Sequence, residues 1–99
     1  MATPLNFFRG SAPASVTKVY TVPDSNKAIV TNIVAANTGS AAGSVTVKLG
    51  GWDLLSAVGI AAKGVLTVEI NQVLAEGEAI EVQGTGAQCS LHISGVEVA

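Results

Sequence analysis

His92 and Cys89 are the only histidine and the only cysteine of the chain, and they are the residue types best suited to nucleophilic catalysis or metal binding. A thiolate–imidazole couple needs both groups on one side of an element, and a zinc site needs further ligands. The alternating residues 89–93 predict a strand in which Cys89 points with Leu91 and Ile93 while His92 points the other way. We therefore expect structural or surface roles for both residues, and no metal site.

The other groups with chemical potential are carboxylates and glycines. Glu76, Glu78 and Glu81 crowd one short segment, where an acid–base pair or a calcium site would need a partner or an Asp-rich ligand loop that the sequence does not contain. A solvated acidic edge is the expectation. No phosphate-loop string is present, so turns are expected at Gly39, Gly43, Gly50 and Gly51. These residues predict no cofactor and no enzymatic activity.

Trp52 is the one aromatic residue that follows a turn signal, Gly50-Gly51. An indole exposed there could stack on a sugar ring or dock into a protein partner. Capping one end of its own sandwich is the role that we favour over binding. The sequence leaves both roles open.

The composition indicates a single domain with an unusually uncharged surface. The chain has 99 residues, of which 48% are hydrophobic and 12% are charged, and its net charge is −2. Such a surface is either covered with small polar residues or covered in part by a partner, and we favour the partner. Nucleic-acid binding is not expected, because the basic residues are scattered singly: Arg9, Lys18, Lys27, Lys48 and Lys63.

Neither a membrane span nor a disulfide is expected. The most apolar segment, residues 28–36, is interrupted by Thr31 and Asn32. Cys89 has no second cysteine with which to pair, which fits a reducing compartment or an assembly made in one.

Short alternating runs of β-branched residues predict an all-β fold. In residues 44–49, Val45, Val47 and Leu49 alternate with polar residues, and residues 65–70 and 79–83 repeat the pattern. Weaker strands are expected over 17–22 and 54–61. Turn signals fall at residues 23–26, 37–40, 50–51 and 84–86. This rhythm predicts a two-sheet antiparallel sandwich or jelly roll of seven or eight strands.

Three segments depart from simple alternation. Residues 27–37 place Ile29 and Ile33 on one face and Val30 and Val34 on the other, which predicts a central strand or one whose outer face meets another subunit. The phase change in residues 89–98 predicts a bulge at Gly95. Residues 71–77 predict a single helical turn.

Residues 1–15 have no period and two prolines, yet they hold both phenylalanines. We expect an extended N-terminal arm followed by a sandwich domain over residues 16–99. Exposed rings would be an aggregation hazard, so the arm should be ordered by a neighbouring chain. The expected partner-binding residues are Leu5, Phe7, Phe8, Arg9 and Trp52.

Six strings, residues 20–23, 28–39, 45–49, 60–64, 73–80 and 92–98, together resemble small β-sandwich structural proteins of tailed-bacteriophage virions. The resemblance covers residues 17–98. It implies a non-enzymatic capsid decoration (cement) protein, often a trimer, that binds the major capsid protein or other virion proteins. The expected location is then a virion assembled in the host cytoplasm. The alternative is a head- or tail-fibre component that binds a receptor or carbohydrate through Trp52 and the polar loops near Asn37 and Gly84. Attachment through the arm predicts that deleting residues 1–15 abolishes binding without unfolding the domain.

Overall fold

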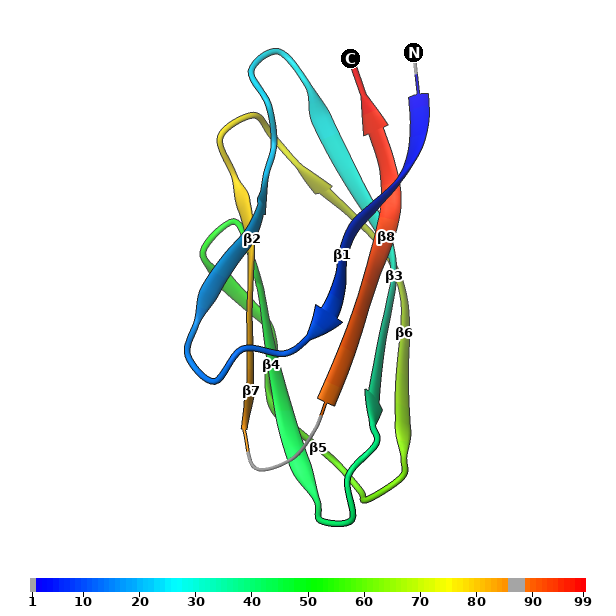
Figure 1. Ribbon diagram of the computed structural model, residues 1–99. Coiled ribbons are helices and arrows are strands. Elements are labelled where there is room, and N and C mark those ends of the chain that lie inside the picture. Colours follow the sequence, from blue (N-terminus) through cyan, green and yellow to red (C-terminus); the bar gives the residue numbers. More distant parts are fainter. Residues whose placement is uncertain (1, 86–88) are drawn as a thin grey trace.

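The computed structural model describes residues 2–85 and 89–99, and within them it shows an all-β sandwich (Figure 1). Eight strands form two antiparallel sheets of four strands each, which confirms the predicted fold class. The strands are β1 (Ala2–Ser11), β2 (Thr17–Thr21), β3 (Lys27–Asn37), β4 (Gly43–Leu49), β5 (Trp52–Ile60), β6 (Val65–Leu74), β7 (Ala79–Thr85) and β8 (Cys89–Val98). The described part of the chain contains no helix that could cross a membrane.

The two sheets are the two layers of the sandwich. Sheet A has the order β1-β8-β3-β6, and sheet B has the order β2-β7-β4-β5. Strands β3 and β8 are the two central strands of sheet A and pair along their whole length, from Lys27 opposite Val98 to Asn37 opposite Cys89. The prediction that residues 27–37 form a central strand is therefore confirmed.

The core lies between the sheets and is made of the inward residues that alternation predicts. Val45 and Val47 of β4 and Ile80 of β7 are fully buried, and Ile33 and Leu91 meet them from sheet A. Each such side chain stabilises the fold by about 1.5–3 kcal/mol relative to an exposed one. Along β6, the even-numbered residues 66–70 pack on this core and the odd-numbered residues 65–69 face solvent.

The expected N-terminal arm is wrong: residues 2–11 are strand β1, which pairs with β8 at the edge of sheet A. Phe7 is buried in the domain's own core at 6% exposure, and its ring centroid lies 4.6 Å from that of Tyr20. Phe8 and Leu5 pack on the same core. The register of β1 shifts between Asn6 and Phe8, so neighbouring rings both reach the inside, where a regular strand would turn one outward.

A second register shift changes the expected faces of β3. Thr31 is an extra residue between Val30 and Asn32, so Val30 and Ile33 both face the core instead of opposite sides. The outward residues of this strand are Ile29, Asn32 and Val34. Its outer face is half-buried by neighbouring side chains of its own sheet.

The bulge expected at Gly95 lies instead in the two neighbouring strands. The extra residues are Phe7 of β1, opposite the Ile93–Ser94 step of β8, and Thr31 of β3, opposite the Ser94–Gly95 step. A Cβ at Gly95 would collide with the Ile29 carbonyl oxygen and lie 2.9 Å from Cε2 of Phe7. Glycine is therefore required there because a ring and a backbone carbonyl cover the position.

The expected helical turn over residues 71–77 is also wrong. Strand β6 continues through Leu74, because Val73 and Leu74 pair with Ile29 and Ala28 of β3. A tight turn then follows, in which the Glu78 amide donates to the Ala75 carbonyl at 3.1 Å. The turn expected at residues 84–86 is not found at Gly84, which lies within β7, and Gly86 is outside the described residues.

Candidate binding surfaces

The outer face of sheet A is a nearly uncharged, β-branched surface. Cross-strand register and alternation place the outward residues of all four strands in ranks, which are rows of side chains that run across the sheet from strand to strand. Its charged residues among those described are Arg9, Lys27 and Glu69. The ranks are Pro4, Val96, Ile29 and Val73; Asn6, Ser94, Asn32 and Glu69; Arg9, His92, Val34 and Thr67; and Ser11, Ser90, Ala36 and Val65.

Apolar side chains on this face are open to solvent at the β6 edge. Val73 is 62% exposed and Val65 is 64% exposed, at opposite ends of the strand. Ile29, Val96 and Val34 lie half-buried behind them. Exposed apolar side chains that share one face of a sheet are suited to contact with another protein.

The outer face of sheet B has the opposite character. Register places Lys18, Glu81, Lys48 and Asp53 side by side on β2, β7, β4 and β5. The charges alternate in sign across the sheet, and the Lys48 Nζ lies 3.8 Å from the Asp53 Oδ1. Thr46 and Gln83 form the next polar pair. This face places opposite charges on neighbouring strands and presents polar groups to water.

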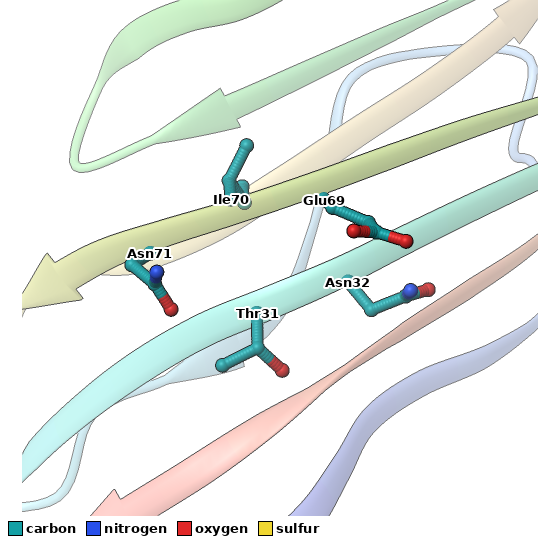
Figure 2. Close-up of a pocket in the computed structure, with 5 residues that line it drawn as sticks. All are labelled: Thr31, Asn32, Glu69, Ile70 and Asn71. Atoms are coloured by element: carbon teal, nitrogen blue, oxygen red, sulfur yellow. The ribbon is translucent and has the colours of Figure 1, made fainter.

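A shallow pocket of about 450 Å³ lies where β3 and β6 are both irregular. Its lining residues are Thr31, Asn32, Glu69, Ile70 and Asn71. Figure 2 shows Glu69 and Asn32 side by side on neighbouring strands, with Ile70 turned away from the polar groups. The sequence analysis did not identify this pocket. Its signal was the Thr31-Asn32 interruption of the most apolar segment.

Arg9 and His92 are neighbours on the same face. They are directly opposite on β1 and β8, and the Arg9 Nε donates to the His92 Nδ1 at 3.1 Å. Only a neutral imidazole offers that acceptor. Cys89 is buried on the other side of β8, so the predicted separation of Cys89 and His92 is confirmed.

Trp52 lies at the tip of the β4–β5 hairpin and is 82% exposed. The possibility that it caps its own sandwich is therefore wrong. Gly50 and Gly51 have φ values of +62° and +86°, which make the two-residue turn that presents it.

Trp52 does not share a site with Asn37 and Gly84, which lie near the other end of the sandwich, because β4 begins beside Gly84 and ends at the Trp52 hairpin. Asn37 is only 1% exposed. Its side-chain amide donates to the carbonyls of Ala41 and Ile60 at 2.8 and 3.1 Å. It is a structural turn residue, and the carbohydrate site expected from these three residues together does not exist.

Two of the three closely spaced glutamates, Glu76 and Glu78, stabilise turns by accepting backbone hydrogen bonds. Glu76 accepts a hydrogen bond from the Ser25 amide at 3.0 Å, and Glu78 accepts one from the Ala75 amide at 2.7 Å. Glu81 belongs to the row of alternating charges on the outer face of sheet B, called here the charge ladder. Over residues 2–85 and 89–99, no three His, Cys, Asp or Glu side chains group closely enough to hold a metal ion.

Tyr20 and Glu97 join the two sheets near one end of the sandwich. The Tyr20 hydroxyl donates to the Glu97 Oε2 at 2.5 Å, and the Asn26 side chain donates to the Glu97 Oε1 at 3.3 Å. Burial, reinforced by the hydrogen bond and charge of Glu97, raises the pKa of Tyr20 well above its usual value. The pair is a structural clamp between β2 and β8.

The fold and surfaces define a two-sheet antiparallel β-sandwich domain with one outer face that carries few, separated charges. No family model and no curated protein matches the sequence. Among solved structures, the chain is similar to an exo-β-1,3-galactanase from Phanerochaete chrysosporium determined with galactose, at a TM-score of 0.43 and 16% identity. The similarity covers 95% of this chain but 29% of that enzyme chain. A likeness this distant supports no statement about function.

Proposed function

We propose that this protein is a non-enzymatic structural component of a larger protein assembly. The observation that carries the proposal is the outer face of sheet A, where β-branched side chains extend across β8, β3 and β6 with few charges. The outer face of sheet B shows that the same chain can form a polar face with a complete charge ladder. The uncharged face is therefore a specific feature of sheet A, and it fits a contact between protein subunits.

Within that class we propose a capsid decoration protein of a tailed-phage virion, bound to the major capsid protein. Support comes from the sequence resemblance over residues 17–98 and from the low charge of the chain. The arm no longer contributes, because Phe7 fills the domain's own core. Trp52 takes its place as the proposed shell contact, since a rigidly presented indole is a common anchor of protein interfaces.

Binding to shells assembled from the major capsid protein of the same genome tests this assignment. Wild-type protein should co-sediment with the shells, and Trp52→Ala should weaken binding by about tenfold or more. Val16→Ala, which also removes an exposed apolar side chain, is the matched control and should bind normally. Failure of the wild-type protein to bind would contradict the decoration assignment.

The alternative is a receptor- or carbohydrate-binding module of a fibre, and the exposed Trp52 indole is the observation that favours it. Trp52 is the only tryptophan, so its intrinsic fluorescence reports on this position alone. Titration with a panel of bacterial surface glycans should quench or shift that fluorescence if a sugar stacks on the indole. An unchanged spectrum across the panel, together with shell binding, would exclude the module in favour of the decoration protein.

A further inference from the structure

The geometry points to a second copy of this chain as the occupant of the outer face of sheet A. In this dimer, Arg9 of each copy enters the shallow pocket of the other copy between β3 and β6, called here the Glu69 pocket. The inference rests on the proposed function, because it names the partner at the surface that the proposal treats as a subunit contact. Arg9 and Glu69 are both exposed. Within the described residues, neither has an ion-pair partner of its own.

The pocket has the chemistry of a guanidinium site. Glu69 supplies a carboxylate, Asn32 and Asn71 supply amide oxygens, and Thr31 supplies a hydroxyl oxygen. The Thr31 hydroxyl donates to the Ser94 carbonyl at 3.3 Å, which leaves its lone pairs for an incoming donor. Guanidinium–carboxylate pairs are planar and often bidentate, so an accessible carboxylate with neighbouring acceptors suits arginine.

Arg9 is prepared for such a contact. Its Nε is held by the His92 Nδ1, which fixes the side chain on the outer face of sheet A. The terminal nitrogens of the guanidinium still carry N–H donors for a carboxylate. Arg9 therefore needs little further ordering before it pairs with a neighbouring molecule.

The positions of the two residues select one symmetry. Arg9 lies on β1 and Glu69 lies on β6, at opposite edges of sheet A and in adjacent ranks. A two-fold axis running along the strands, between β8 and β3, places β1 of each copy over β6 of the other and forms both pairs at once. An axis across the strands would place β1 over β1 and β6 over β6, and would keep Arg9 and Glu69 at opposite edges of the interface. Charge complementarity therefore favours the first arrangement.

The face is large enough for this dimer. Four strands 4.8 Å apart, with ranks spanning about eight residues, give roughly 500 Å² per copy or roughly 1,000 Å² in total. That area is near the lower limit for a specific interface. Ile29, Val96 and Val73 would supply apolar contacts at one end of the interface.

Sedimentation velocity over a concentration series up to about 0.5 mM tests the inference, because a small interface dissociates on dilution. Wild-type protein should approach twice the mass of the chain. Arg9→Glu and Glu69→Arg should each raise the dimer dissociation constant by about 100-fold. The two-fold symmetry places each charge reversal in both Arg9–Glu69 pairs of the dimer. The double variant Arg9→Glu/Glu69→Arg should recover most of the affinity. Lys18→Glu, which makes the same charge change on the outer face of sheet B, should leave it unchanged.

A monomeric wild-type protein at the highest concentration would overturn the inference. So would single reversals that match Lys18→Glu, or a double variant that fails to regain affinity. The shell-binding assay separates this outcome from the proposed function. A monomer that binds shells overturns only the dimer, whereas a dimer that ignores shells overturns only the decoration assignment.

Discussion

The outer faces of the two sheets differ although both sheets have four antiparallel strands around one core. On sheet B, four charged residues alternate in sign across the strands and compensate one another. On sheet A, most of the corresponding positions carry valine, isoleucine, alanine and small polar residues, and its charges Arg9, Lys27 and Glu69 are separated, with Arg9 and Glu69 at opposite edges. The comparison teaches that a face whose opposite charges are neighbours is suited to water, whereas a face with few and separated charges is suited to a partner.

The largest expected effect concerns the strand that completes sheet A. Phe7→Ala should reduce the free energy of unfolding by about 3–5 kcal/mol, because the ring is buried against Tyr20 and Gly95. Urea unfolding followed by circular dichroism measures it. Phe8→Ala, at a half-buried neighbour, is the control and should cost less. Equal and small losses of unfolding free energy in both variants would show that β1 does not pack on the core. The outer face of sheet A would then lose one of its edge strands.

A smaller effect is expected where the sheets are joined. Tyr20→Phe should cost about 1–2 kcal/mol at neutral pH, because Glu97 keeps only the Asn26 hydrogen bond. Chemical denaturation of both proteins at one pH measures this loss. Wild-type stability would contradict the clamp between β2 and β8.

The same clamp predicts a pH dependence. The folded-state pKa of Tyr20 is raised above the usual value of 10.0, so its contribution is complete below about pH 10 and is lost as the pH rises toward the folded-state value. Above about pH 10, wild-type stability should therefore fall more steeply with rising pH than that of Tyr20→Phe. Parallel curves for the two proteins would show that the phenol is not clamped.

The smallest effect is expected on the outer face of sheet B. Glu81→Gln removes a central charge of the ladder and should cost about 0.2–1 kcal/mol, since exposed ion pairs contribute little. The loss should shrink at 1 M salt, where the screening length is about 3 Å. A loss unaffected by salt would mean that the ladder is not electrostatic, and the contrast between the faces would weaken.

The sequence predicted those parts of the fold where alternation is regular. Val45, Val47 and Ile80 gave clear inward positions because period-two patterning maps directly onto a pleated strand. Phe7 and Thr31 could not be placed, because each is an extra residue that breaks the period, and a bulge is visible only once the partner strand is known.

The candidate surfaces were predictable only in part. Trp52 was singled out because it directly follows a two-glycine turn, and its exposure could not be predicted from that position alone. The Glu69 pocket and its relation to Arg9 depend on cross-strand register between segments far apart in the chain. No local pattern encodes that register, so these residues emerged only from the structure.

Matched lysine substitutions on the two faces test the central claim most directly. Val73→Lys and Thr21→Lys each place a charge on an exposed β-branched position of an edge strand, the first on sheet A and the second on sheet B. The weight-average mass at about 0.5 mM should fall to that of one chain for Val73→Lys and stay at the wild-type dimer value for Thr21→Lys. Equal masses for the two variants would contradict the assignment of the outer face of sheet A as the assembly surface.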